Sequence, residues 1–432
     1  MSLRDRLETL RRQRGRVAAG SQPNAAGSLV IPADWHRRPE LATLADRLRR
    51  IQTRTLRTPP SPPRTRSRCE AAHLADLLDG EICAPGVILT ERRLPLSARH
   101  GAVTLRDAAL PVHRFPESEV DPRLSAFVDT ETTGLSGGSG TVVFLLGAGR
   151  FEDDAFVVRQ YLLTSFGGEA DLLAAAAEWI TPAKTMVTYN GKTFDLPLLA
   201  ARCRLAGVAD RFSRIAQVDL LHPARRAFAR RWEDCRLATA ERRLLRFERE
   251  DDLPGSEAPQ SWFRFVRHGL AAMLPRVAEH NYRDVVSLAA LLPALADVHA
   301  EPGAWEADIL SVARAYDRAG DKARAVVMLN EHRSMLDADG LLELASLHRQ
   351  RKDWNAAAII WSDLAARGHR EAIERLAKYH EHVVRDFAAA LAYADHLPRH
   401  PDHEHRRARL RAKLARIAPI LPARVDASTV AL

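Results

Sequence analysis

The chain has few cysteines and no long apolar stretch, and both absences restrict the class of protein. Cysteine occurs four times in 432 residues, as Cys69, Cys83, Cys203 and Cys235, with no C-x-x-C pair. This spacing predicts neither a disulfide framework nor a zinc site and favours a reducing compartment. No apolar run approaches the roughly 18 residues of a membrane span, and the N-terminus lacks an apolar signal-peptide core. We therefore expect a globular, cytoplasmic protein with no membrane partner.

Lysine is absent from residues 1–68, although the basic charge of the chain is concentrated there. This segment has 16 Arg and 5 acidic residues, so its net charge is +11. Since the whole chain has a net charge of +9, the remainder carries −2. Residues 58–64 are proline-rich, as in a polyproline-type linker. We expect 1–68 to be a basic, largely disordered arm. It is either a solvated tether or a salt-sensitive contact for nucleic acid or a protein partner.

The pattern from residue 69 to 298 predicts an α/β fold. Residues 69–120 form a lead-in with a helix at 71–78 and short strands at 86–89 and 102–105. In 121–298, three strands precede alternating helices and strands, which is the plan of an RNase H-like mixed sheet flanked by helices. The predicted strands there are 125–128, 141–146, 155–163, 186–189 and 215–220, and the predicted helices are 170–180 and 196–205.

Residues 301–400 differ in composition and predict an all-α domain of helical repeats. Asp321, Asp353 and Asp386 recur in similar contexts at spacings of 32 and 33 residues. A period near ~34 is typical of tetratricopeptide-like repeats, which bury their faces by stacking and present a concave surface. That surface would bind a protein partner. Residues 401–432 are expected to form a basic helix and a loose tail.

Two acidic side chains stand at the end of the first apolar strand of the sheet. Asp129 and Glu131 are two residues apart, so in an extended chain they point the same way. Their mutual repulsion is relieved by a divalent cation, since Mg²⁺ and Mn²⁺ take hard oxygen ligands. The alternative is a pair of exposed acids at the mouth of a loop.

Further acids follow downstream, each with a structural alternative. Asp195 comes after a strand and opens a helix, so it is a metal ligand, an N-cap, or both. Asp284 lies four residues after His280 and therefore on the same helix face. A histidine beside a metal-binding carboxylate is a candidate general base, and otherwise an ordinary helix-surface residue. Asp219 ends a strand and is either an additional ligand or a helix cap.

The acids occur in the order D-x-E, N-G-x-x-F-D and H-x-x-x-D. This order resembles the DEDD superfamily of 3′–5′ exonucleases, whose RNase H-like fold brings four such acids around two divalent metal ions. His280 precedes Asp284 by four residues, whereas the histidine subgroup places it five before. Over roughly residues 85–295 the chain is more closely similar to the YprB-like family of bacterial proteins, on stretches that include 85–89, 218–226 and 252–259.

The resemblance implies two-metal hydrolysis of phosphodiester bonds. It places two Mg²⁺ or Mn²⁺ ions on Asp129, Glu131, Asp195 and Asp284, with His280 helping to prepare the attacking water. The substrate would enter as a single-stranded 3′ end of RNA or DNA. Expected substrate contacts are Thr130, Thr132, Asn190, Phe194 and Asn281. The aromatic residues Tyr189, Trp262, Phe263 and Tyr282 either stack on bases or belong to the core.

Two other functional classes compete with an exonuclease. One is a non-catalytic nucleic-acid-binding protein that kept the fold, and the other is a repeat-based interaction scaffold. The complete set of four acids favours the enzyme. The repeats favour an additional protein partner, which is compatible with the enzyme.

Overall fold

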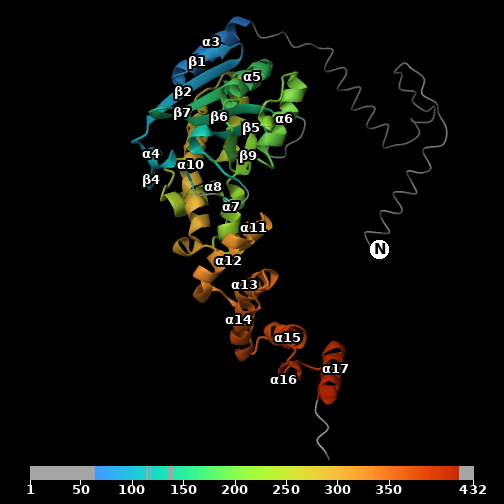
Figure 1. Cartoon of the computed structure of the whole chain (residues 1–432). Helices are drawn as coiled ribbons and strands as arrows, with labels where there is room; N and C mark the ends of the chain where they lie inside the picture. The colour runs from blue at the N-terminus through green and yellow to red at the C-terminus, as the bar shows by residue number, and fades with distance from the viewer. Residues whose placement is uncertain (1–63, 113–114, 117, 135–139, 418–432) are drawn as a thin grey trace, which may run out of the picture. The chain divides into compact units, whose positions relative to one another are not determined.

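The computed structural model describes residues 64–112, 115–116, 118–134 and 140–417. Most of the predicted arm 1–68, with its proline-rich linker, and the tail after residue 417 lie outside the described residues. From Ser67 onward the chain forms one compact unit. The helices and strands of this unit are labelled in Figure 1.

A seven-stranded mixed sheet is the centre of the first part, which confirms the predicted α/β fold class. The strand order is β1-β2-β7-β6-β5-β8-β9. The central strand β5 (Ser125–Thr132) pairs antiparallel with β6 (Val143–Phe151) and parallel with β8 (Thr185–Thr188). Strand β8 also pairs parallel with β9 (Ala216–Asp219). The other strands are β1 (Glu81–Ala84), β2 (Val87–Pro95) and β7 (Ala155–Leu163), with a separate ribbon of β3 (Arg99–His100) and β4 (Val103–Thr104).

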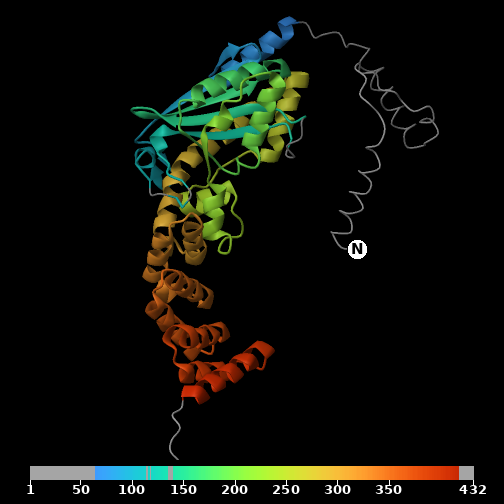
Figure 2. The same ribbon diagram turned by 45° about the vertical axis from the view of Figure 1, so that its right-hand side comes forward.

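Helices cover both faces of the sheet, and α10 (Leu274–Ala300) is the longest of those described (Figure 2). Phe127 of β5 shares a buried cluster with Val285 of α10, whereas its neighbour Val128 shares another with Leu172 of α5. This alternation gives β5 two apolar faces, as a central strand requires. The other helices of this part are α3 (Arg64–Leu77), α4 (Leu105–Ala108), α5 (Glu169–Ile180), α6 (Asp195–Ala206), α7 (Leu221–Phe228), α8 (Leu237–Ala240) and α9 (Ala258–His268), with a π-helical turn η5 (Glu241–Leu245).

Two glycines of β6 allow α10 to lie directly against the sheet. A Cβ atom added at Gly147 would overlap the side-chain oxygen of Asn281, and one added at Gly149 would meet Val285 Cγ1 at 2.7 Å. Glycine inside a strand commonly marks such a close approach. The pair therefore sets how near α10, with Asn281 and Asp284, comes to β5.

Some boundaries differ from those predicted. Strand β7 has the predicted bounds, 155–163, but β6 continues to Phe151 instead of ending at 146. The sequence did not indicate this extension because it contains Gly147 and Gly149, the two glycines that accommodate α10. The predicted strand 102–105 is confirmed only at Val103 and Thr104, because Ala102 lies in a turn and Leu105 begins α4. Thr104 caps that helix by accepting a hydrogen bond of 3.1 Å from the backbone nitrogen of Asp107.

Residues 309–417 form successive helix pairs joined by short turns and contain no strand, which confirms the predicted all-α region. Asp321, Asp353 and Asp386 each cap the second helix of a pair, accepting from the backbone nitrogen three residues on, at 3.0, 3.2 and 3.0 Å. The recurring aspartate of the sequence is therefore a recurring N-cap. The helices are α11 (Ile309–Arg318), α12 (Lys322–Glu331), α13 (Ala338–Gln350), α14 (Trp354–Ala366), α15 (Arg370–Tyr379), α16 (Phe387–Asp395) and α17 (Pro401–Ile417).

The helix pairs are joined to the sheet domain by hydrogen bonds and by a common core. The backbone nitrogen of Asp308 donates to the Ala227 carbonyl at 2.8 Å, and Arg324 of α12 donates to the Ala300 carbonyl at the end of α10 at 2.6 Å. One buried apolar cluster extends from Phe127 of the sheet to Ile360 of α14. Helix α10 therefore belongs to both parts of the molecule.

Among the described residues, no helix combines the length and the apolar character needed to cross a membrane. Cys83, Cys203 and Cys235 are free thiols.

Candidate active site

The structure brings the four predicted acids together from three elements. Asp129 and Glu131 lie on β5, Asp195 is the first residue of α6, and Asp284 lies on α10. All four are largely or partly buried. They are near enough that the negative charges of Asp284, Asp195 and Glu131 all raise the pKa of Asp129. A cluster of like charges in a partly buried place is costly unless a cation compensates it.

The pKa values of these acids are raised because burial and neighbouring negative charges disfavour their ionised forms. Burial, followed by the charges of the other acids, raises the pKa of Asp129 well above its ordinary value. Burial and the charges of Asp284 and Asp195 raise the pKa of Glu131 to about 8. Burial also raises the pKa of Asp195 to about 6, although a hydrogen bond from Thr130 opposes the shift. The site therefore favours either protons or cations on its carboxylates.

Asn281 holds Asp129 in place. Its Nδ2 atom donates to Asp129 Oδ2 at 2.9 Å, and its Oδ1 atom accepts from Gln160 Nε2 at 2.8 Å. Asn281 has no exposed surface. This burial argues against the substrate contact expected from the sequence and assigns Asn281 a positioning role.

Asp195 is held by a hydroxyl on the neighbouring strand. Thr130 Oγ1 donates a hydrogen bond to Asp195 Oδ1. The N-cap position of α6 is Phe194, not Asp195, and no side chain caps it. The N-cap alternative for Asp195 is therefore wrong, and its carboxylate faces β5. Thr130, which the sequence suggested as a substrate contact, orients this carboxylate.

His280 faces two of the acids with one ring nitrogen and a fifth acid with the other. Nε2 lies 4.0 Å from Glu131 Oε1 and 3.7 Å from Asp284 Oδ2. Nδ1 lies 2.9 Å from both oxygens of Asp252. The imidazole side chain is 16% exposed, so it is reachable from solvent but mostly enclosed. This orientation suits a group that exchanges a proton at Nε2.

Arg249 is a central member of the site, and no pattern in the sequence pointed to it. It forms ion pairs with Glu241 at 2.6 Å and Asp252 at 3.0 Å, and a further one with Asp284. Burial raises the pKa of Asp284, and the positive charge of Arg249 opposes that shift. Among the described residues, Arg249 and His280 are the basic side chains that pair with these acids.

The donor set fits hard divalent cations, but its side chains are turned toward protein groups. Four carboxylates with raised pKa values are the ligands that Mg²⁺ and Mn²⁺ prefer. Over the described residues, no three side chains of His, Cys, Asp or Glu converge as a ready set for one ion. The carboxylates instead bond to neighbouring protein groups: Asp195 to Thr130, Asp129 to Asn281 and Asp284 to Arg249.

The remaining predicted substrate residues differ in accessibility. Phe194 is 50% exposed next to Asp195. Asn190 has a left-handed backbone (φ 69°), and its backbone nitrogen donates to Asp219. Thr132 Oγ1 donates to the Gly134 carbonyl at 2.9 Å. Phe194 is thus accessible to solvent, whereas Asn190 and Thr132 have local structural partners.

Two of the aromatic alternatives are settled by their contacts. Trp262 is fully buried, stacks on Phe144 and donates from Nε1 to the Leu163 carbonyl at 2.6 Å. Tyr189 donates from its hydroxyl to the Cys235 carbonyl at 2.7 Å. Both belong to the core and its polar edge.

Asp219 organises the loop that leads to Asp195. It is 3% exposed and accepts from the backbone nitrogens of Asn190 at 2.7 Å, Lys192 at 3.1 Å and Leu221 at 3.0 Å. Leu221 is the first residue of α7. The N-cap position of α7 is Leu220, so Asp219 binds the backbone nitrogen at the start of α7 without being its N-cap, and it fixes the turn before α6.

The family model described as the RNase_H superfamily matches residues 126–296, which hold all four acids. The chain is also 31% identical over 343 residues to the protein named "Uncharacterized protein YprB" of Bacillus subtilis (strain 168), a match that covers 74% of this chain and 81% of that one. The chain belongs to the RNase H superfamily and, within it, to the family of YprB.

Among solved structures, the family B DNA polymerase from the hyperthermophilic archaeon Pyrobaculum calidifontis matches 57% of this chain and 35% of its own, at 15% identity and a TM-score of 0.34. So distant a likeness carries no argument here. Membership in the RNase H superfamily indicates a nuclease-type function on nucleic acid. Nucleases of this superfamily generally use divalent metal ions.

Proposed function

We propose that the protein is a metal-dependent 3′–5′ exonuclease that hydrolyses single-stranded nucleic acid. The observation that carries this proposal is the convergence of Asp129, Glu131, Asp195 and Asp284 with Nε2 of His280 directed at two of them. Superfamily membership supports nuclease chemistry, and the order of the acids supports the exonuclease type.

In the proposed mechanism the four acids bind metal ions and His280 transfers a proton. Two bound Mg²⁺ or Mn²⁺ ions would supply an activated water and stabilise the leaving oxygen. Asp129, Glu131, Asp195 and Asp284 would hold these ions, since burial and then the charges of neighbouring acids raise their pKa values and a cation would relieve both effects. His280 would take a proton from the attacking water at Nε2. Half-exposed Phe194 would stack on a base near the 3′ end.

The test is degradation of single-stranded RNA and DNA, labelled at either end, with Mg²⁺ or Mn²⁺. The wild type, Asp129→Ala and the control Asp153→Ala are compared, because Asp153 is an exposed acid in the turn between β6 and β7. We expect metal-dependent shortening from the 3′ end in the wild type and the control, and its loss in Asp129→Ala. The label position reports the polarity, and the two polymers report the substrate.

Absence of cleavage by folded wild-type protein would contradict the proposal. If salt-sensitive binding of the same oligonucleotides remained, the non-catalytic nucleic-acid-binding alternative would replace it. Cleavage that persists in Asp129→Ala would place the activity in another site or another protein.

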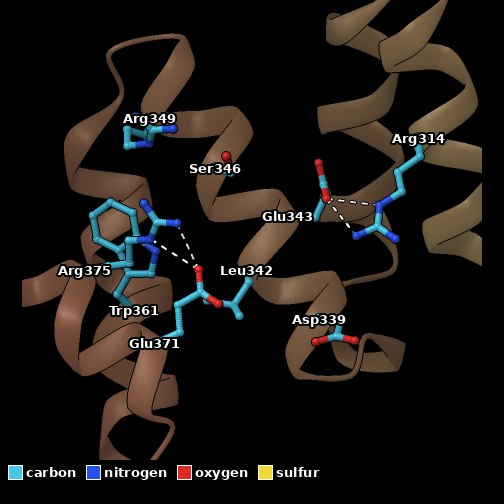
Figure 3. Close-up of a pocket in the computed structure, with 9 residues that line it drawn as sticks. All are labelled: Arg314, Asp339, Leu342, Glu343, Ser346, Arg349, Trp361, Glu371 and Arg375. Atoms are coloured by element: carbon cyan, nitrogen blue, oxygen red, sulfur yellow. Dashed lines mark hydrogen bonds and ion pairs between the residues drawn. The ribbon is translucent and has the colours of Figure 1, made fainter. Parts of the chain in front are cut away.

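A second candidate function, binding of a protein partner, is favoured by a groove between helices α11, α13, α14 and α15. The groove has a volume of about 360 Å³, and arginine–glutamate pairs stand within it (Figure 3). Arg314 pairs with Glu343 at 2.9 Å, and Arg375 pairs with Glu371 at 2.9 Å. Side chains of both signs line the groove, and the buried Trp361 forms part of its floor, so the groove suits a charged, extended peptide segment.

Arrays of peptides probed with the full chain test this candidate. The matched variants are Arg349→Glu in the groove and Arg367→Glu, which lies outside the groove on the same helical region. Peptides bound by the wild type and the control but not by Arg349→Glu would support the groove. Equal binding by all three proteins would exclude it as the peptide site.

A further inference from the structure

We propose that Asp252 is a positioning residue that holds His280 as its Nδ1–H tautomer, so that Nε2 meets the four-acid site as a proton acceptor. This inference rests on the proposed function for its catalytic meaning, but its structural part stands alone. Asp252 lies outside the four-acid set and comes from the segment between η5 and α9.

The contact between Asp252 and His280 is direct. Both carboxylate oxygens of Asp252 lie 2.9 Å from His280 Nδ1. The His280 side chain is 16% exposed and that of Asp252 is 20% exposed, so the pair is largely shielded from solvent. A hydrogen bond to a charged group in such surroundings is among the stronger ones in a protein.

The ionisation state of the Asp252 carboxyl determines which ring nitrogen of neutral His280 carries the proton. Burial raises the pKa of this carboxyl, but hydrogen bonds from His280 and Arg249 outweigh that effect and lower its pKa below the ordinary value. An ionised carboxylate only accepts hydrogen bonds. His280 must therefore carry its proton on Nδ1 in the neutral ring, which leaves the lone pair on Nε2.

A hydrogen bond from Arg249 to His280 would favour the opposite tautomer. Its Nη1 atom lies 3.3 Å from His280 Nδ1 and 3.0 Å from Asp252 Oδ2. Arginine only donates, so an Arg249 bond to Nδ1 requires the other tautomer, with the proton on Nε2. His280 Nδ1 is closer to the two oxygens of Asp252 than to Arg249 Nη1, and Arg249 Nη1 already donates to Asp252. Both observations favour the Nδ1–H form.

Asp252 is itself held firmly through Arg249. Arg249 Nε and Nη2 donate to the two oxygens of Glu241 at 2.7 and 2.6 Å. Glu241 has no exposed surface and also accepts from Ser287 on α10. The segment that carries Asp252 is therefore tied to the same helix that carries His280, which keeps the imidazole in a fixed direction.

The structural part is tested by nitrogen-15 NMR of the histidine rings in metal-free, full-length protein. The His280 signals are those missing from His280→Gln. We expect the Nδ1–H tautomer in the wild type and in Asp251→Ala, whose substituted side chain is 92% exposed and one residue away. In Asp252→Ala, Arg249 becomes the nearest polar neighbour of Nδ1, so we expect the Nε2–H tautomer. An unchanged tautomer in Asp252→Ala would overturn the proposal.

The catalytic part is tested by a double-mutant cycle on nuclease activity. We expect Asp252→Ala to lower kcat by about 10- to 100-fold with little change in KM, because it alters the base and not the binding of substrate. In a His280→Ala background the same substitution should have almost no further effect. Equal losses in both backgrounds would show that Asp252 acts independently of His280 and would overturn the proposal. Asp252→Asn, which keeps the shape of the side chain, replaces Asp252→Ala if the latter fails to fold.

The two tests separate this inference from the function on which it rests. If the wild type cleaves nothing but Asp252→Ala switches the tautomer, the exonuclease proposal fails and the positioning role of Asp252 survives. If the wild type is active and Asp252→Ala retains both the His280 tautomer and kcat, the exonuclease proposal survives and the positioning role of Asp252 fails.

Discussion

Asn281 on α10 donates a hydrogen bond of 2.9 Å to the carboxylate of Asp129 on β5, and so connects two elements that are far apart in the sequence. We predict that Asn281→Ala weakens Mn²⁺ binding and activity by about 10- to 100-fold, because Asp129 loses its orienting partner. Gln160 also loses an acceptor, which should cost about 1–3 kcal/mol of unfolding free energy. Calorimetric Mn²⁺ titration and urea unfolding measure the two effects. Asn330→Ala, on α12, is the control, and unchanged Mn²⁺ affinity would refute the positioning role.

Gly147 sets the approach of α10 to the sheet, because an added Cβ would overlap Asn281. Gly147→Ala should therefore destabilise the protein by about 1–3 kcal/mol, as overpacking does in cores, and should weaken Mn²⁺ binding as well. At Gly167 the nearest atom to an added Cβ is 3.9 Å away, so Gly167→Ala serves as control. Urea unfolding of both variants provides the comparison, and equal stabilities would contradict the packing described.

The raised pKa of Glu131, about 8, predicts how stability depends on pH in EDTA. Between the ordinary glutamate pKa and about 8, the folded protein binds more protons at this site than the unfolded chain does. The free energy of unfolding should therefore fall as pH rises through this range. Glu131→Gln removes the titrating group, so its melting temperature should exceed that of the wild type near pH 8. Glu178→Gln, at an exposed position of α5, should behave as the wild type does; a Glu131→Gln curve parallel to the wild type would disprove the prediction.

Asp386 caps α16 by accepting from the backbone nitrogen of Ala389 at 3.0 Å. Asp386→Ala should cost about 1 kcal/mol of stability, whereas Asp386→Ser should retain most of it, because serine also accepts at an N-cap. Thermal unfolding followed by circular dichroism measures the difference. If alanine and serine gave the same melting temperature, the cap would not contribute to stability.

The sequence predicted the acids better than it predicted what surrounds them. Asp129 and Glu131 could be placed because strand alternation fixes their common side, and the period of Asp321, Asp353 and Asp386 has a local cause in capping. Strand β7 was bounded correctly because its residues are apolar almost throughout.

Arg249 and Asp252 could not be found in the same way. They lie between η5 and α9, outside any regular element, and no periodic pattern marks them. Their roles arise from tertiary contacts with Glu241, His280 and Asp284, which no local rule encodes. Asn281 was selected, but as a substrate contact, since a sequence does not show that glycines in β6 bury it against the sheet.

One apolar cluster extends from Phe127 to Ile360, so we expect the sheet domain and the first helix pairs to unfold together as one unit. The fraction of molecules with an assembled four-acid site is then governed by the stability of the whole unit. A substitution in the helix pairs that removes about 1.4 kcal/mol raises the unfolded fraction about tenfold at every position of the unit, including the acids. A mutation in these helices that lowers nuclease activity therefore identifies a binding surface only after its effect on the folded population has been subtracted.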